Sequence, residues 1–302
     1  MEGPTPVSAL IHAATMVTAG VFLIIRCSYL FEYCLDMLLI IGIAGSLTCL
    51  FSATIGIIQN DIKKIIAFST CSQLGYLVFS CGLSVYNVSF FHLINHAFFK
   101  ALLFLTSGII IHALNNEQDT RKMGGMVKLL PYSYSFMLIG SLALTGFPFL
   151  SGFYSKDIIL EISCTKYKLI GSFSYFLGSI AAFFTAFYSI RLLLLTFFIR
   201  SNSFRYNLIK IHEGSKSLGL FLLLLVIGSV YSGYLFKDLF IGFGSVFFNN
   251  SINVLGRNSI HFELEFLPLY IKSIPTFFSI LGFSVAFYCY QFLFHNLPNT
   301  IF

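Results

Sequence analysis

The stretch that decides the fold is VSFFHLINHAFFKALLFLTSGIIIH, residues 88–112. It is mostly apolar, yet it carries two histidines and a lysine in its first half. A helix that crosses a membrane needs about 20 predominantly apolar residues, and this stretch is long enough. Titratable side chains are expensive inside such a helix and are by default functional. The stretch therefore predicts a membrane helix that carries a site.

The composition of the whole chain supports the same class of protein. The 302 residues are 57% hydrophobic and only 10% charged, with a mean hydropathy of +0.86. A soluble domain carries roughly 25% charged residues. This chain has too little polar surface for a water-soluble globule, which excludes a soluble enzyme, a nucleic-acid-binding protein and a disordered protein. The net charge of +6 is interpreted as loop topology rather than as a sign of an acidic partner.

The pattern of cysteines and glycines predicts neither a metal nor a redox cofactor on this chain. None of the seven cysteines forms a C-x-x-C pair, and most lie in or beside apolar runs. An odd number of dispersed cysteines is typical of neither a zinc site, an iron–sulfur cluster nor a disulfide framework. A G-x-G-x-x-G motif after a strand is also missing from the sequence. We expect no direct electron transfer by this chain.

We predict one all-α transmembrane domain over residues 1–302, a polytopic helix bundle of about eight spans. Within the fifth span, Gly146-Phe147-Pro148 and Ser151-Gly152 predict a discontinuous helix near 146–152, because proline removes a donor and glycine loosens the helix. The alternative is two short helices joined by a surface loop. The Lys156-Asp157 pair favours a buried break. The predicted spans are 5–26, 36–58, 62–84, 88–112, 131–163, 168–200, 217–240 and 267–294.

Loop charges predict the orientation. With eight spans, both chain ends and the even connections share one side of the membrane. That side holds nine lysines and arginines, against at most six on the other. The positive-inside rule then places the N-terminus on the matrix side if the protein is mitochondrial.

The strongest candidate site is a row formed by His92, His96 and Lys100, called here the titratable row. Their i, i+4, i+8 spacing keeps them on one helix face, with about 6 Å between successive side chains along the axis. One or two waters can bridge such a gap. Histidine titrates near neutral pH, and low dielectric disfavours the charged form of a lysine. The row therefore favours a water-linked proton relay. A snorkelling lysine with satisfied core histidines is the alternative, and a metal site would need a third ligand.

A second candidate site is Lys156 with Asp157, just past the predicted break. Exposed half-helix ends at a break can hold protonatable groups. Asp157 is predicted either to pair with Lys156 or to cap the second half-helix, and an ordinary interfacial ion pair is the alternative. His12, beside Ser8, Thr15 and Thr18, is either a relay element or a satisfied helix–helix hydrogen bond. Asp61 is a relay candidate or a helix-start charge. Weaker candidates are His112, Glu161 and Arg191, of which Arg191 is expected to snorkel.

Several long motifs give the chain a resemblance to a known family. Residues 1–21, 59–76 (QNDIKKIIAFSTCSQLGY), 92–104, 121–125 and 152–157 (GFYSKD) resemble the antiporter-like subunits of NADH–ubiquinone oxidoreductase, respiratory complex I. The family also includes subunits of multisubunit cation/proton antiporters. The 1–21 and 121–125 runs resemble subunit 5 more than subunits 2 and 4. The match is dense over 1–165, the core part, and looser over the C-terminal spans in 166–302.

The resemblance implies roles for individual residues. Lys100 matches the family's central proton-carrying lysine, and His92 and His96 match the histidines that link it to its neighbours. Lys156 matches the lysine near the exit toward the intermembrane side, and His12 lies on the hydrated axis. The NADH, flavin, iron–sulfur and quinone sites of the resembled complex lie on other subunits.

The resemblance also implies partners. In the family, several spans precede the position of Met1 and carry the half of the path that takes up protons, and a lateral helix follows the last span. We expect a separately encoded chain to supply the N-terminal half, with the subunit 4 equivalent, other membrane-arm subunits and lipids as further partners, and no nucleic acid. The implied function is proton translocation in the mitochondrial inner membrane. The alternatives are a cation/proton antiporter subunit and a non-pumping structural subunit.

Overall fold

The computed structural model describes residues 3–166, 169–203, 211–242, 247–248, 251–258 and 267–296; within these, the side chains of residues 12, 13, 257 and 291–296 are not described. Across the described residues the regular secondary structure is helical, apart from one isolated bridge between Asp61 and Asp119. This confirms the all-α prediction. The elements are α1 Thr5–Val7, η1 Ser8–Thr15, α2 Met16–Arg26, α3 Ser28–Tyr33, α4 Leu35–Ile58, α5 Ile62–Gly82, α6 Tyr86–Ala113, η2 Thr120–Lys122, α7 Pro131–Thr145, η3 Phe153–Asp157, α8 Ile158–Thr165, α9 Leu169–Leu193, η4 Leu194–Phe198, α11 Lys216–Ile241, η5 Gly256–Asn258 and α12 Leu269–Asn296.

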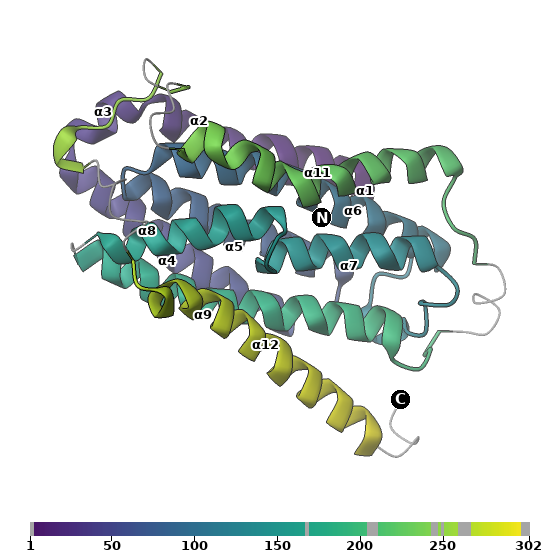
Figure 1. Cartoon of the computed structure of the whole chain (residues 1–302). Helices are drawn as coiled ribbons and strands as arrows, with labels where there is room; N and C mark the ends of the chain where they lie inside the picture. Colours follow the sequence, from purple (N-terminus) through teal and green to yellow (C-terminus); the bar gives the residue numbers. More distant parts are fainter. Residues whose placement is uncertain are drawn as a thin grey trace.

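The bundle matches the predicted set of spans. Among the described residues, seven helical segments are long and apolar enough to cross a membrane. The remaining predicted span is the fifth in chain order. It is the broken one, because α7 has only 15 residues and is followed by η3 and α8. Successive spans run in alternating directions, so that the starts of α5, α7 and α11 lie at one end of the bundle (Figure 1). The first described residues and the end of α12 belong to that same end.

The break in the fifth span occurs where glycine and proline predicted it. The last turn of α7 is closed by Gly146 in the left-handed conformation, with φ of 85°. Phe149 also has a positive φ, of 70°, and the helix resumes at Ser151. Thr145, Gly146 and Ser151 are buried, whereas residues 147–149 are exposed. The break therefore combines both sequence expectations, because its half-helix ends are packed inside the bundle while its connecting residues lie on the surface.

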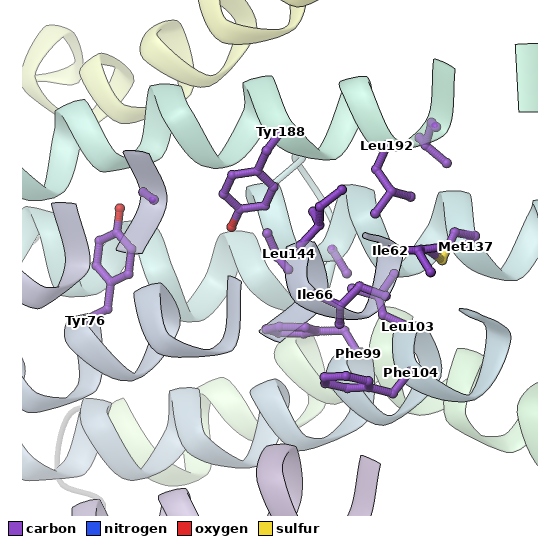
Figure 2. Close-up of a cluster of buried hydrophobic side chains, with 14 of the residues drawn as sticks. Ile62, Ile66, Tyr76, Phe99, Leu103, Phe104, Met137, Leu144, Tyr188 and Leu192 are labelled. Atoms are coloured by element: carbon purple, nitrogen blue, oxygen red, sulfur yellow. The ribbon is translucent and has the colours of Figure 1, made fainter. Parts of the chain in front are cut away.

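Helix α4 packs closely against α5. A Cβ placed on Gly75 would lie 2.7 Å from the Cα of Cys49, and one on Gly82 would lie 2.6 Å from the Cα of Gly42. Only glycine permits backbones to approach this closely, which is typical of helix pairs in membranes. The apolar window of α5 is 78% buried, against 22% for α11 and for α12. The core around α5 and α6 is the scaffold that holds the candidate site (Figure 2).

Arg191 does not snorkel as predicted. Its side chain is 6% exposed and donates to the backbone carbonyls of Ile57 and Gln59, the latter at 2.6 Å. It also donates to the Asn60 side chain at 2.7 Å. The last carbonyls of a helix have no partner within the helix, and Arg191 satisfies those at the end of α4. These acceptors hold the guanidinium inside the bundle. They belong to another part of the chain, so the sequence of α9 alone does not predict the burial of Arg191.

Candidate functional site

The titratable row lies on α6, in the middle of the bundle. His92, His96 and Lys100 are all fully buried. Their helix forms because 28 mostly apolar residues from Tyr86 to Ala113 contain neither proline nor any acidic residue. The ring centroids of His92 and His96 are 6.3 Å apart, as the i, i+4 spacing predicted. The row therefore faces the protein interior rather than lipid.

One end of the row is joined to the broken helix. The Nδ1 atom of His92 lies 2.8 Å from the hydroxyl oxygen of Ser155. Ser155 directly precedes Lys156 in the chain, so this hydrogen bond joins α6 to the segment that carries the second lysine. The neighbouring Asn95 accepts from Ser232 of α11 at 2.8 Å and lies within reach of the Ser151 carbonyl, at 3.5 Å. The half-helix that follows the break is thus attached to α6 through side chains.

The other end of the row contacts α5. The ammonium of Lys100 donates to the hydroxyl of Ser69. Gln73, one turn further along α5, is fully buried, and among the described residues neither its amide nitrogen nor its oxygen has a protein partner. The same holds for both ring nitrogens of His96. Buried polar groups without protein partners are typically hydrogen-bonded to internal waters.

Lys156 is placed at the meeting point of four helical segments. It is 1% exposed and donates to the hydroxyl of Thr185 at 3.0 Å. Its ammonium also lies 3.5 Å from the carbonyl of Thr145 at the end of α7 and 5.3 Å from the ring centre of Tyr76. A carbonyl at a helix end and an aromatic face both attract a cation. The surroundings can therefore hold the lysine in its charged form as well as its neutral form.

Asp157 interacts with the charge of Lys156 without forming a close ion pair, and it does not cap the half-helix. The described residues contain no ion pair within 4.0 Å between Asp157 and Lys156. Asp157 is also no cap, because the helix has already resumed at Ser151. Its carboxylate instead lies against the break, where a Cβ on Gly146 would come within 3.3 Å of Oδ1. A Cβ here would require the Asp157 carboxylate to move by a few tenths of an ångström, so the positive φ is the main reason for glycine at position 146.

Asp61 lies outside the site. It is the residue before the first turn of α5 and forms an exposed ion pair with Lys64 at 2.9 Å. This is the helix-start charge that was the alternative to a relay role. The adjacent Asp119 accepts from Arg121, and this hydrogen bond lowers the pKa of its carboxyl. His12 belongs to η1, which packs against α6, but its side chain lies outside the described residues.

Two buried charged residues at the opposite end of the bundle were missed by sequence reasoning. Glu32 is fully buried and accepts from the side chain of Asn258 at 2.9 Å. Lys166, 5% exposed, donates to the Asn258 carbonyl at 3.0 Å and to the Leu83 carbonyl. Both residues sit at the ends of spans, where a charge is ordinary, so no signal in the sequence marked them as buried. Their hydrogen bonds hold the 251–258 segment against the ends of the helices.

The arrangement is suited to moving protons and is poorly suited to holding a metal. Among the described residues, no group of three or more His, Cys, Asp or Glu side chains comes together. A structural metal site needs more ligands than the two histidines of the row. By contrast, buried lysines and histidines whose gaps one or two waters can bridge exchange protons through hydrogen-bonded water. The chemistry available here is proton transfer along α6 and across to the broken helix.

Comparison with known sequences supports a family assignment. Residues 1–185 match the family described as NADH:quinone oxidoreductase/Mrp antiporter, TM. The chain belongs to this family. With seven apolar spans among the described residues alone, this member of the NADH:quinone oxidoreductase/Mrp antiporter family is a multi-pass membrane protein. The resemblance inferred from the motifs is confirmed.

The individual relatives are complex I subunits and an antiporter. The chain is 58% identical over 288 residues to NADH-ubiquinone oxidoreductase chain 5 of Marchantia polymorpha, covering 95% of this chain and 43% of the relative. It is 54% identical to the chain of the same name from Phytophthora infestans, covering 99% and 45%. The structure of the Mrp complex from Dietzia sp. DQ12-45-1b superposes with a TM-score of 0.75 at 25% identity, over 99% of this chain and 32% of that chain. The chain thus spans less than half the length of the curated relatives it matches.

Proposed function

We propose that this chain carries the central and exit part of a proton path in the membrane arm of respiratory complex I. The observation that carries the proposal is the buried connection from Lys100 through His96 and His92 to Ser155 and Lys156. Each of these groups is held inside the bundle, where a titratable side chain is costly unless it has a function. Similarity to chain 5 of NADH-ubiquinone oxidoreductases supports the choice of complex.

In this proposal a proton moves from Lys100 toward Lys156. Redox energy released elsewhere in the complex changes the hydration and the charge balance around the two lysines. His96 and His92 pass the proton along α6, and Ser155 connects His92 to the half-helix that bears Lys156. Release occurs toward the intermembrane space, with the N-terminus on the matrix side of the mitochondrial inner membrane. The excess of lysine and arginine predicted at the N-terminal side supports this orientation.

The proposed partners follow from the length of the relatives. More than half of each relative lies outside the region that this chain matches. We infer that the chain assembles with other membrane-arm subunits of the complex, with the subunit 4 equivalent and lipids as neighbours. The NADH, flavin, iron–sulfur and quinone sites belong to other subunits. Cross-linking mass spectrometry of the purified complex tests this inference, and a lack of cross-links from this chain to any membrane-arm subunit would overturn it.

The test of the function is Lys100→Ala in the assembled complex. We expect NADH oxidation to continue while the number of protons pumped per NADH falls, because the central acceptor of the path is gone. Proton uptake by inverted membrane vesicles and NADH absorbance measure the two quantities. The matched control is Lys64→Ala on the neighbouring helix, whose side chain is 56% exposed and paired with Asp61. Normal pumping by the Lys100→Ala complex would reject the assigned role.

A cation/proton antiporter subunit is the second candidate, favoured by the likeness to the Mrp complex. It predicts proton transport that is stimulated by sodium and does not depend on NADH. The third candidate is a structural subunit that does not pump. It predicts unchanged pumping after Lys100→Ala and Lys156→Ala together.

A further inference from the structure

Buried hydroxyl groups of α5 and α9 contact both lysines. Lys100 donates to the hydroxyl of Ser69 on α5. The next hydroxyl along α5 is that of Ser72, which donates to the backbone carbonyl of Ser69 at 3.0 Å. The hydroxyl of Tyr188 on α9 lies 3.4 Å from the hydroxyl of Ser72. At the far end, Lys156 donates to Thr185, which precedes Tyr188 by one turn of α9.

All of these hydroxyls are inside the protein. Ser69 and Tyr188 are each 2% exposed, and Ser72 and Thr185 are fully buried. Side chains three residues apart on a helix are neighbours, and helical side chains lean toward the N-terminus. The phenol of Tyr188 therefore leans toward the turn of α9 that holds Thr185, the hydrogen-bond partner of Lys156. Figure 2 shows its ring reaching from α9 into the interior, with the oxygen directed toward α5 and α7.

The ring of Tyr188 is held in this position by a glycine of a third helix. A Cβ added at Gly56 of α4 would lie 3.2 Å from the Cδ1 atom of Tyr188, so the ring packs directly against the backbone. A residue that served only to fill space here would need no hydroxyl. In the core of a membrane bundle a phenol needs a polar partner, and the partner of Tyr188 is Ser72, three residues along α5 from Ser69, which contacts Lys100.

We propose that Tyr188 is a further proton-carrying residue, part of a second route from Lys100 to Lys156 that bypasses His96 and His92. The inference rests on the proposed function, since it adds a parallel branch to the same path. Ser69 and Tyr188 carry the proton, while Thr185 positions Lys156 to receive it.

The step balances without any oxidant or cofactor. The ammonium of Lys100 gives a proton to the oxygen of Ser69, whose own hydroxyl proton rotates away from the Ile66 carbonyl, 2.7 Å distant. That proton passes through one water molecule, beside the hydroxyl of Ser72, to the oxygen of Tyr188. The phenol proton of Tyr188 passes to one water molecule in the one-turn gap, and that water protonates the neutral amine of Lys156. Each hydroxyl gains one proton and loses one. Lys100 ends as an amine and Lys156 as an ammonium.

The experiment compares variants in the assembled complex, measuring protons pumped per NADH oxidised in inverted vesicles. Tyr188→Phe removes the hydroxyl and keeps the ring against Gly56. His96→Leu interrupts the histidine branch. If the branches carry comparable flux, each single variant retains about half of the pumping and the double variant loses it as fully as Lys100→Ala, because parallel rates add. The matched control is Tyr175→Phe on the same helix, whose hydroxyl has no hydrogen-bond partner among the described residues.

Two further readouts separate a proton-carrying role from a structural one. Tyr188→Phe should change the solvent isotope effect on pumping in D₂O, which a loss of packing would leave unaltered. Ser72→Ala, which removes one of the hydroxyls beside Tyr188 and touches neither lysine, should lower pumping in the same direction by a smaller amount. Amounts of assembled complex on native gels establish that each variant is complete.

The outcomes distinguish this inference from the proposed function. Loss of pumping in Lys100→Ala together with unchanged pumping in Tyr188→Phe and Ser72→Ala, and with a double variant no worse than His96→Leu, overturns the second route alone. Unchanged pumping in Lys100→Ala overturns the proposed function itself. A fall in Tyr188→Phe with an unaltered isotope effect assigns Tyr188 to packing and also rejects the proposal.

Discussion

At the scale of single residues, the serine after the break is as important to the site as the lysine beside it. Ser155 is buried, contacts Nδ1 of His92 at 2.8 Å and lies 3.1 Å from the Ser151 carbonyl one turn earlier. Among the described residues, its hydrogen bond to His92 joins the row to the broken helix. A hydroxyl can both accept and donate, so it can orient the imidazole and pass a proton.

We therefore expect Ser155→Ala to lower proton pumping per NADH by about three- to tenfold, less than the loss of a general acid or base, because water can partly replace the hydroxyl. Vesicle proton uptake measures the effect. The control is Ser163→Ala on α8, where the equally buried hydroxyl bonds only the Leu160 carbonyl of its own helix. Equal pumping by the two variants would contradict a role for Ser155 in the path.

At the scale of elements, the contact between α4 and α5 determines whether the surroundings of Lys100 form. Ser69, the partner of Lys100, is on α5, and the glycine contacts of that helix keep it against α4. A methyl group at Gly75 would meet the backbone of Cys49 at 2.7 Å, and backbone cannot move aside as a flexible side chain can. The two helices would have to separate.

Gly75→Ala is expected to destabilise the bundle by about 1–3 kcal/mol, the usual cost of overpacking. The measurement is the midpoint temperature of unfolding and the yield of assembled complex. Gly219→Ala near the start of α11 is the matched control, since a Cβ there meets nothing within 4 Å in this chain. A Gly75→Ala complex as stable as the control would show that the two helices tolerate wider spacing.

At the scale of the whole molecule, the alternating spans place Cys34 at the end of the bundle opposite the first described residues. Its thiol is exposed, in the connection between α3 and α4. In the proposed orientation this connection faces the intermembrane space. Cys71 is also exposed, but it lies in the middle of the α5 span, where lipid or a partner excludes water.

A membrane-impermeant maleimide should therefore label Cys34 in mitoplasts, where the intermembrane face is open, and spare it in inverted vesicles. Cys71 should remain unlabelled in both, because the reactive thiolate forms only with access to water. Mass spectrometry of the labelled peptides distinguishes the two sites. Labelling of Cys34 in inverted vesicles alone would reverse the assigned orientation.

The sequence by itself determined the features that depend on local chemistry. A run of about 20 apolar residues is sufficient for a span in any surroundings, so the membrane class and the spans could be predicted. The periodicity of 3.6 residues placed His92, His96 and Lys100 on one face before any packing was known. The discontinuity at Gly146 follows from the conformational freedom of glycine and the missing donor of proline, both of which act within a single turn.

Only the tertiary structure decided which groups these residues meet. Ser155 lies 63 residues from His92, Ser69 lies 31 from Lys100, and Tyr188 lies 116 from Ser72. Serines and tyrosines recur throughout an apolar chain, and no local pattern separates those that face a lysine from those that bond their own helix. The burial of Arg191 and of Glu32 could not be predicted from the sequence either. A charged side chain at the end of a span can lie in water or inside the bundle, depending on the hydrogen-bonding groups that neighbouring segments supply.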